Sequence, residues 1–344
     1  MPTGLSAEVI IVGAGLAGLS AAIYLGRARR DTLVIDSGKS MAQWEPDVQN
    51  YLGFPKGIGG VELLKRGREQ AEGRKIRFRR DKIAFVRARR DGFSLRGARQ
   101  HYSCRRLLLC TGIFHLPPEI PSLLPCLGHS MFFCKDCDGL RVQGKPIGIY
   151  GHGNETVEYA LGMLFYSPCV AIITDGKKIL WDGKHARWIE EYKIPIYQKR
   201  IVGVHRETRK VRSLRFADGK EVELAGLFVT RGDIYYNKLA KGLGAKVDEE
   251  GQIVVDLCMR TTVKGVYAAG CVTPASCQMI IAAGQGATAA QAINRDLFKE
   301  SLATHSLRRF RVKQLKTRRT KPVVKKATIN PADSNVDCHS KSPQ

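Results

Sequence analysis

The chain has 344 residues, of which 44% are hydrophobic and 26% are charged, and it contains 35 glycines and 10 cysteines. This composition excludes a wholly disordered chain, a collagen-like chain and a disulfide-stapled miniprotein, and the length favours about two domains. The formal net charge is +24. Because the cysteines are irregularly spaced, we expect a reduced, cytoplasmic setting in which a cysteine pair serves redox or metal chemistry.

The first predicted elements form a strand–turn–helix–strand unit. An apolar strand at residues 8–12 precedes the turn Gly13-Ala-Gly-Leu-Ala-Gly18, a helix and a second strand that ends at Asp36. Gly13 permits the tight turn, Gly15 lets the backbone approach a pyrophosphate, and Gly18 lets helix and strand pack closely. We expect phosphate to bind at the helix N-terminus and Asp36 to accept the hydroxyls of an adenine ribose.

The same unit recurs further along the chain. A strand at residues 146–150 precedes Gly151-His-Gly-Asn-Glu-Thr156, a helix and a strand that ends near Asp175. The acid follows the first glycine by 24 residues here and by 23 residues in the first copy. Two units of matched length predict two dinucleotide folds, the second with a nicotinamide-nucleotide site at Gly151, Gly153, Thr156 and Asp175.

The sequence after residue 232 returns to the character of the first unit, with a strand at 265–270 and a long Ala-rich helix at 278–300. We therefore predict an α/β protein with two Rossmann-like nucleotide-binding domains, the second inserted into the first. The expected boundaries are 1–117 and 246–303 for the outer domain, 118–245 for the inserted domain and 304–344 for a basic, disordered tail.

The predicted tail is strongly basic. The last 44 residues carry 11 Lys and Arg against 2 Asp. Three interpretations stay open: an unstructured extension, attachment to nucleic acid or an anionic membrane, and docking to a partner protein.

A Cys-x-x-Cys-Asp-Gly motif is the second feature that points to chemistry. Cys134 and Cys137 can reach each other across one helical turn and cycle between dithiol and disulfide, while Asp138 moves the proton. Two alternatives are a zinc site, in which Cys126 and His129 complete a compact ligand set, and a plain buried cysteine pair.

Together these motifs resemble those of the low-molecular-weight thioredoxin reductases, which are FAD-dependent pyridine nucleotide-disulfide oxidoreductases of class II. The shared landmarks follow the family order over residues 8–300, and they include Asn50-Tyr-Leu-Gly-Phe-Pro55, Thr111-Gly112 and Gly265-Val-Tyr-Ala-Ala-Gly270. The resemblance implies FAD in the outer domain, a redox disulfide in the inserted domain and a homodimer. It also implies a thioredoxin-like protein or a small disulfide or dithiol as the substrate.

The resemblance assigns roles to individual residues. Cys137 is the cysteine expected to contact the flavin, Cys134 the one expected to attack the partner disulfide, and Asp138 the acid/base. The residues expected to hold FAD are Gly13, Gly15, Gly18, Asp36, Gln43, Asn50, Val86 through its backbone, Thr111, Gly112, Gly270, Cys271, Gln278 and Met279.

Three positions depart from the family pattern. Cys271 stands where the family carries an Asp that contacts FAD, and a thiol replaces a carboxylate only weakly. Thr156 adds bulk to the second turn, which we expect to strain the contact between helix and strand. Thr174-Asp175-Gly176 replaces the His-Arg-Arg run that grips the 2′-phosphate of NADPH, and a carboxylate there suits the free ribose hydroxyls of NADH.

The electron donor therefore stays open between NADPH, NADH and a different donor. Two alternatives are a ferredoxin-linked reductase and a dithiol oxidase that passes electrons to oxygen. Residues 1–300 carry 45 Lys and Arg against 30 Asp and Glu, which suits docking to an acidic protein such as ferredoxin. A further alternative is a non-catalytic flavin or zinc protein with a nucleic-acid-binding tail.

Overall fold

The computed structural model describes residues 4–308 and 311–312, and its first sheet begins with the predicted apolar strand. In β1 (Leu5–Val12) the side chains at positions 9–11 are fully buried. β1 pairs in parallel with β2 (Thr32–Asp36) and β6 (His101–Leu109). Helix α1 (Leu16–Arg27) makes the crossover that a parallel pair needs. The first predicted strand–turn–helix–strand unit therefore lies where the sequence places it.

The outer sheet has seven strands and combines parallel with antiparallel pairs. Its order is β3 (Arg77–Arg80), β2, β1, β6, β5 (Gly92–Gly97) and β4 (Ile83–Arg89), and β17 (Val266–Ala268) also pairs with β6. β17 follows the inserted domain in the chain and pairs in parallel with β6. The chain thus returns to its first sheet after the insertion, as predicted, and then forms helix α7 (Met279–Ala303).

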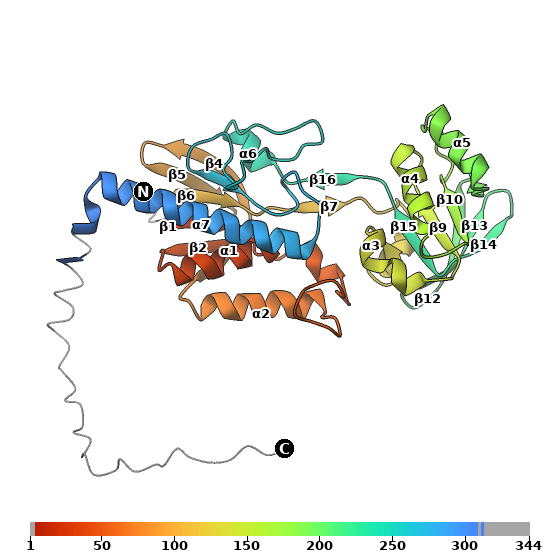
Figure 1. Ribbon diagram of the computed structural model, residues 1–344, viewed down its shortest axis with the longest axis horizontal. Helices are drawn as coiled ribbons and strands as arrows, with labels where there is room; N and C mark the ends of the chain where they lie inside the picture. The colour runs from red at the N-terminus through yellow and green to blue at the C-terminus, as the bar shows by residue number, and fades with distance from the viewer. Residues whose placement is uncertain (1–3, 309–310, 313–344) are drawn as a thin grey trace, which may run out of the picture. The chain divides into compact units, whose positions relative to one another are not determined.

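The inserted domain is built on a second sheet of five parallel strands (Figure 1). Its order is β11 (Ile196–Tyr197), β10 (Val170–Ile173), β9 (Ile147–Tyr150), β15 (Gly226–Val229) and β8 (Met131–Phe132). The side chains of β9, β10 and β15 are buried throughout, as expected for parallel strands covered on both faces.

Two helices and a small antiparallel sheet complete the inserted domain. Helices α4 (Asn154–Met163) and α5 (Gly183–Glu191) make the crossovers from β9 to β10 and from β10 to β11. The antiparallel sheet consists of β12 (Ile201–Glu207), β13 (Lys210–Phe216) and β14 (Glu221–Glu223). Its buried side chains join those of β9 and β15 in one core. The second predicted nucleotide fold is therefore present.

Two short strands carry the chain between the domains. β7 (Ile113–His115) pairs antiparallel with β16 (Asp233–Tyr235), as Figure 1 shows. β7 is the outgoing crossing and β16 the returning one. After β16, helix α6 (Lys238–Gly242) buries two apolar side chains in the outer core.

The remaining elements are short, apart from helix α2. They are α2 (Gly60–Glu72), α3 (Lys135–Asp138) and the 3₁₀ helices η1 (Met41–Trp44), η2 (Pro121–Cys126) and η3 (Gly139–Val142). Within the described residues, no helix combines the length and the apolar character that crossing a bilayer requires. Most of the predicted basic tail lies outside the described residues.

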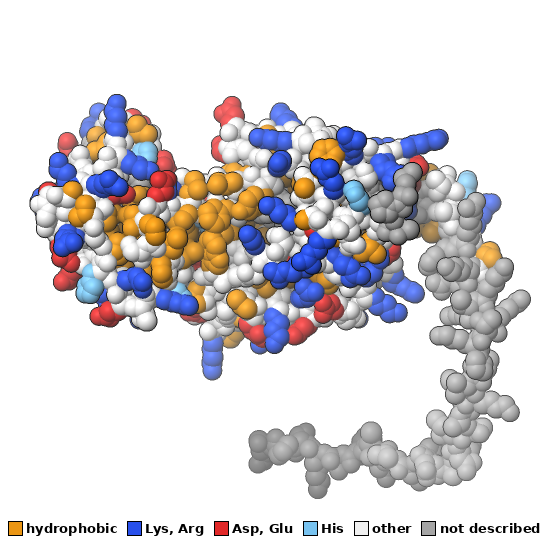
Figure 2. Space-filling model, turned by 180° about the vertical axis from the view of Figure 1, so that it is seen from behind, with side chains coloured by type: hydrophobic (Ala, Val, Ile, Leu, Met, Phe, Trp, Pro, Cys, Tyr) orange, Lys and Arg blue, Asp and Glu red, His pale blue; other side chains and the backbone are white. Residues whose placement is uncertain are grey.

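Lys and Arg side chains are spread widely over the face shown in Figure 2, and hydrophobic side chains gather in one patch of it. On this face, Lys and Arg side chains are therefore not confined to one cluster. A positively charged surface attracts acidic partners.

Candidate active site

A cavity of about 700 Å³ is lined by residues of both nucleotide-binding domains. A volume of this size suits a large organic cofactor. Most of the residues predicted to hold FAD line it, namely Gly13, Gly15, Asp36, Asn50, Thr111, Gly112, Gly270, Cys271, Gln278 and Met279. The predicted catalytic residues Cys134, Cys137 and Asp138 line the same cavity. The fold therefore brings the predicted flavin cradle and the predicted redox motif together.

The turn after β1 has the form that a pyrophosphate requires. A Cβ atom at Gly13, where φ is +105°, would lie 2.2 Å from the carbonyl oxygen of Cys110. A Cβ atom at Gly18 would lie 1.9 Å from the carbonyl oxygen of Gly13. A side chain at either glycine would collide with the backbone that packs against this turn, so the turn has the close glycine packing that the phosphate end of FAD requires.

Asp36 connects this turn to the end of β2. Its Oδ1 accepts the Ala14 N–H at 3.0 Å and its Oδ2 accepts the Gly38 N–H at 2.8 Å. Each carboxylate oxygen has two lone pairs, so one on each remains for a ribose hydroxyl. Asp36 also lines the cavity, as the predicted ribose contact must.

Gly18, Gln43 and Val86 do not line this cavity, and their assignment to FAD stays a prediction. Gln43 lines a second cavity, and its Nε2 donates to the Gly38 carbonyl at 3.4 Å. Val86 is 2% exposed in the middle of β4, where it packs into the outer core. Ile83 and Ala84, at the start of the same strand, line the cavity instead.

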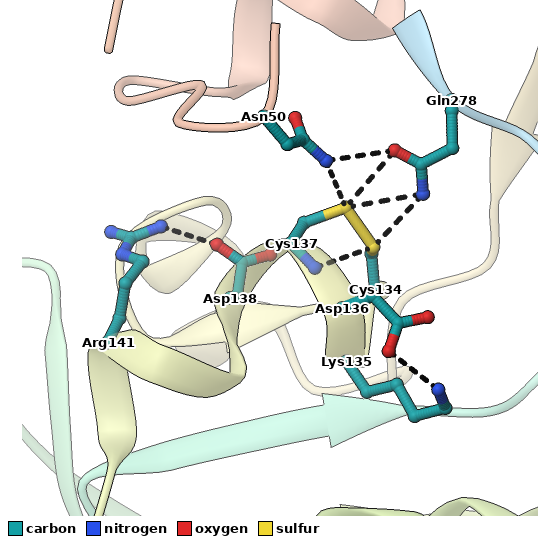
Figure 3. Close-up of a disulfide and its surroundings, with 8 residues drawn as sticks. All are labelled: Asn50, Cys134, Lys135, Asp136, Cys137, Asp138, Arg141 and Gln278. Carbon is teal, nitrogen blue, oxygen red and sulfur yellow. Dashed lines mark hydrogen bonds and ion pairs between the residues drawn. A yellow bond between two sulfur atoms is a disulfide. The ribbon is translucent and has the colours of Figure 1, made fainter. Parts of the chain in front are cut away.

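The Cys-x-x-Cys motif forms a disulfide between Cys134 and Cys137, whose Cα atoms lie 5.3 Å apart. The short helix α3 brings the two side chains to the same side, and Cys134 Sγ accepts the Cys137 N–H at 3.1 Å (Figure 3). A zinc site would need both sulfurs as ligands, and the disulfide joins them to each other instead. Cys126, which that alternative also requires, is fully buried in the inserted core.

Two amide side chains of the outer domain reach this disulfide (Figure 3). Gln278 Nε2 lies 3.4 Å from Cys134 Sγ and 3.5 Å from Cys137 Sγ. Asn50 Nδ2 lies 3.6 Å from Cys137 Sγ and donates to Gln278 Oε1 at 3.1 Å. Donors at this distance favour a thiolate over a thiol once the disulfide opens.

Asp138 lies directly after Cys137 and is 3% exposed. Burial raises the pKa of Asp138, and its ion pair with Arg141, at 2.7 Å, opposes that increase. A buried carboxyl with a raised pKa keeps its proton to higher pH, which suits a general acid beside a thiol. The predicted acid/base therefore has a fitting environment.

Glu45 is a further acidic residue of the cavity and was not among the residues predicted from the sequence. Burial raises the pKa of Glu45 to about 7, with a further contribution from the negative charge of Asp138. Arg141 and His115 oppose this increase. No local sequence signal marks Glu45, because its burial comes from segments that are distant in the chain.

Cys271 is not the free thiol expected from the sequence, because it forms a disulfide with Cys277. The two Cα atoms lie 4.8 Å apart, and both cysteines line the cavity. A disulfide sulfur carries no charge and cannot take the role of the family's carboxylate at this position. Two cysteines six residues apart, just before a predicted helix, were the available signal.

Thr156 is accommodated in the second turn without the expected strain. Its side chain is fully buried, and its Oγ1 hydrogen-bonds Thr230 Oγ1 at 2.8 Å. The Gly153 N–H donates to the same Oγ1 at 3.3 Å. A Cβ atom at Gly151 would lie 2.2 Å from Thr230 Oγ1. The paired hydroxyls thus occupy space inside the turn and use one of its N–H donors.

The Asp175 carboxylate is engaged by the inserted domain itself. Its Oδ2 accepts the hydroxyl of Tyr150 at 2.8 Å, and its Oδ1 accepts the Ile201 N–H at 2.7 Å. Its backbone has φ +51°, a region that Asp tolerates better than most residues. Asp175 therefore connects β9, the end of β10 and the start of β12, which is a structural role.

Comparison with known proteins decides the family. Residues 7–293 match the model of the family described as pyridine nucleotide-disulphide oxidoreductase. The chain belongs to this family. A thioredoxin reductase from Bacillus subtilis is 30% identical over 310 residues, which cover 86% of this chain and 97% of that protein. The chain is also 31% identical to a glucosaminate ammonia-lyase from Pseudomonas fluorescens over 301 residues, which cover 82% of this chain and 93% of the relative.

Solved structures support the same family. The crystal structure of HlmI has a TM-score of 0.81 at 27% identity, and the match covers 91% of this chain and 98% of that one. Membership of this family identifies the protein as an oxidoreductase. The family and the sheet topology together confirm the predicted pair of Rossmann-like domains. It implies FAD and a nicotinamide cofactor, and it does not distinguish NADPH from NADH.

Proposed function

We propose that the protein is an FAD-dependent thiol–disulfide oxidoreductase that reduces a thioredoxin-like protein or a small disulfide, with an electron donor other than NADPH. The observation that carries this proposal is the Cys134–Cys137 disulfide in a cavity that also contains an intact dinucleotide turn. Relatives named thioredoxin reductase, 30% identical over most of the chain, support the substrate class.

FAD, when bound, supplies the electron pair that opens the disulfide. Gly13, Gly15 and Asp36 would hold its pyrophosphate and adenine ribose, and Gln278 and Met279 line the cavity at the start of α7. The N–H groups at a helix N-terminus favour negative charge beside them. These residues bind and orient the cofactor, while the cysteines and Asp138 carry the thiol chemistry.

Cys134 is the better nucleophile toward the partner disulfide. The Cys137 N–H already donates to Cys134 Sγ, and this donor would stabilise a thiolate there. The Cys134 thiolate attacks one sulfur of the partner and the other sulfur leaves as a thiolate. Cys137 then attacks Cys134 Sγ, which restores the disulfide and releases the second partner thiol. Two protons pass to the partner, and Asp138 is placed to transfer one of them.

The second nucleotide fold supports a donor other than NADPH. A 2′-phosphate at the end of β10 would face the Asp175 carboxylate, and like charges repel. Asp175 is also poorly available to a ribose, because Tyr150 and Ile201 already bind its two oxygens. Lys177 and Lys178 lie close in sequence but lack the bidentate fork of Arg.

The net positive charge of residues 1–300 supports an acidic protein as that donor. Ferredoxin has the required chemistry, because it is a small acidic carrier of single electrons. Electrostatic attraction of this kind raises association rates and weakens as salt concentration rises.

An anaerobic titration of the purified holoenzyme tests both parts of this proposal. NADPH, NADH and reduced ferredoxin are added in parallel, with dithionite as the control, while the visible flavin absorption is recorded. We expect bleaching by dithionite and reduced ferredoxin, slow or no bleaching by NADPH, and formation of thiols at Cys134 and Cys137. Rapid bleaching by NADPH would refute the donor assignment. A reduced flavin that leaves the Cys134–Cys137 disulfide closed would refute the disulfide reductase itself.

A further inference from the structure

The cavity contains two disulfides, and the proposed reaction uses only one of them. Cys271–Cys277 lines the same cavity as Cys134–Cys137 but belongs to the outer domain, between β17 and α7. Cys277 is exposed and Cys271 is half-buried. Accessible disulfides are the ones that thiolates open, because attack requires a line of approach to a sulfur atom.

One residue joins the two disulfides. Gln278 follows Cys277 directly in the chain, so their Cα atoms are about 3.8 Å apart. The Gln278 side chain reaches the sulfurs of both Cys134 and Cys137. The Cys137 sulfur has a second outer-domain neighbour in Asn50 (Figure 3). We therefore take Cys137 as the exchange partner of Cys277.

The start of α7 favours a thiolate at Cys277. The Gln278 carbonyl accepts the Ala282 N–H at 2.9 Å, so Gln278 caps α7 and Cys277 immediately precedes the cap. A cysteine at the N-terminus of a 25-residue helix gains stability as a thiolate from the unpaired N–H groups there.

The buried cysteines of the described part of the chain are unsuited to exchange. Cys104, Cys110 and Cys126 are free thiols with almost no exposed surface. Burial raises the pKa of the Cys104 thiol to about 12 and raises that of Cys110 as well, so neither forms a thiolate at neutral pH. Cys104 and Cys126 do not line the cavity; Cys110 does, but its thiol is buried and its raised pKa keeps it protonated.

We propose that Cys271 and Cys277 are a second redox-active couple, which exchanges an electron pair with Cys134 and Cys137 inside the cavity. The proposal rests on the proposed function only in taking Cys134 and Cys137 as a redox couple. Holding both couples in one cavity makes the exchange intramolecular, which strongly favours it over reaction with free thiols.

The exchange balances without any further reductant. The Cys137 thiolate attacks Cys277 Sγ, the bond between Cys271 and Cys277 breaks, and Cys271 takes up the proton that Cys137 lost. Cys134 then attacks Cys137 Sγ, the bond between Cys137 and Cys277 breaks, and Cys277 takes up the proton from Cys134. One disulfide closes and the other opens, and the reverse sequence returns the electron pair.

The first experiment counts thiols in the native full-length holoenzyme. The protein is equilibrated anaerobically in graded mixtures of reduced and oxidised dithiothreitol, alkylated, and analysed by peptide mass spectrometry. We expect four new thiols, at Cys134, Cys137, Cys271 and Cys277, whereas a single redox couple would yield two. A Cys271–Cys277 disulfide that stays closed after Cys134–Cys137 has opened fully would overturn the proposal.

A trapping experiment tests the direct contact. The variant Cys134→Ser/Cys271→Ser retains Cys137 and Cys277, and oxidised glutathione converts two thiols within reach into one disulfide. We expect the yield of the Cys137–Cys277 cross-link to be at least about tenfold higher than that of any Cys137–Cys169 cross-link, because the first pair is held close together. Cys169 is an exposed free thiol of the same chain and serves as the internal control. Equal yields of the two cross-links would overturn the exchange.

The thiol count and the cross-linking experiment can fail independently of the tests of the proposed function. Dithiothreitol reduces the thiols directly, so the count does not depend on the flavin or its donor. A holoenzyme that fails to reduce any partner disulfide while still showing four exchangeable cavity thiols would refute the proposed function and leave the second couple in place.

Discussion

Gln278 Nε2 lies 3.4 Å from Cys134 Sγ, although 144 residues separate them in the chain. Gln278 belongs to the outer domain, and Cys134 belongs to the inserted one. The contact depends on the paired crossing strands β7 and β16 and on the start of α7. It gives the redox disulfide a side-chain hydrogen-bond donor from the other domain, in addition to the Cys137 N–H of its own domain.

Replacing Gln278 by Leu removes this donor and preserves the approximate size of the side chain. A hydrogen bond to a charged group contributes about 1.5–3 kcal/mol, so the loss makes a thiolate at the opened disulfide less favourable. We expect the reduced cysteines to react about tenfold or more slowly with iodoacetamide at neutral pH, since each 1.4 kcal/mol is a factor of ten. Gln43→Leu is the control, because Gln43 does not line this cavity. Equal reactivity in both variants would contradict this role of Gln278.

Replacing Asp138 by Asn removes the proposed proton donor beside Cys137. General acid catalysis contributes about 10²–10⁴-fold, so we expect reduction of the partner disulfide to slow by at least about 10²-fold. The pKa of Asp138 is raised by burial, so the wild-type rate should fall as pH rises through that raised value, and this limb should disappear in the variant. Rates measured across the pH range check this.

Asp136→Asn is the matched control for Asp138. Asp136 lies on the same short helix, is exposed, and pairs with Lys135 at 2.7 Å. We expect little change in rate from it. A similar loss in both variants would indicate a general effect on helix α3 and would argue against acid catalysis by Asp138.

Replacing Glu45 by Gln should change how stability depends on pH. The folded-state pKa of Glu45 is raised from 4.5 to about 7, so the folded protein binds this proton more tightly than the unfolded chain. The resulting stabilisation is complete below pH 4.5 and is lost as pH rises through about 7. Relative to the variant, the wild-type protein should lose up to about 3 kcal/mol of unfolding free energy over this window.

Urea unfolding of the wild-type protein and Glu45→Gln at several pH values measures this difference directly. Both proteins should be compared without added FAD, so that cofactor binding does not contribute. Parallel pH profiles for the two proteins would show that Glu45 titrates normally.

Replacing Asp175 by Ala should destabilise the inserted domain and leave the response to nicotinamide unchanged. The substitution removes the acceptor of Tyr150 and of the Ile201 N–H, at a cost of about 1–3 kcal/mol for each group left buried without a partner. Chemical unfolding measures the loss. Asp218→Ala, at an exposed carboxylate of the same domain, is the control and should change stability by no more than about 0.5 kcal/mol. Unchanged stability with an altered NADH response would instead favour a nucleotide-binding role.

Deleting residues 304–344 tests the interpretations of the basic tail, which lies mostly outside the described residues. The deletion leaves helix α7 intact, since that helix ends at Ala303. If the tail contacts nucleic acid or an anionic membrane, the deletion should weaken retention on heparin. It should also make retention depend less steeply on salt concentration. Unchanged retention and unchanged activity would leave only the interpretation of an unstructured extension.

The sequence alone was sufficient for both nucleotide folds and for the redox motif. Gly13, Gly18 and the apolar strand before them act within a few residues of each other, so their spacing predicts the turn that the structure shows. The same holds for Cys134 and Cys137, which one helical turn brings together. Such patterns can be recognised in the sequence because the residues that form each feature are close together in the chain.

Only the tertiary structure decided which of these residues meet and which are already occupied. The contact of Gln278 with Cys134, the raised pKa of Glu45 and the two hydrogen bonds to Asp175 depend on segments that are distant in sequence. Burial and hydrogen bonding are properties of what packs around a side chain, and a one-dimensional pattern does not contain them. The sequence by itself therefore determined the family, the fold and the chemistry of the cysteine pair. The packing of two domains around one cavity decided the environment in which that chemistry takes place.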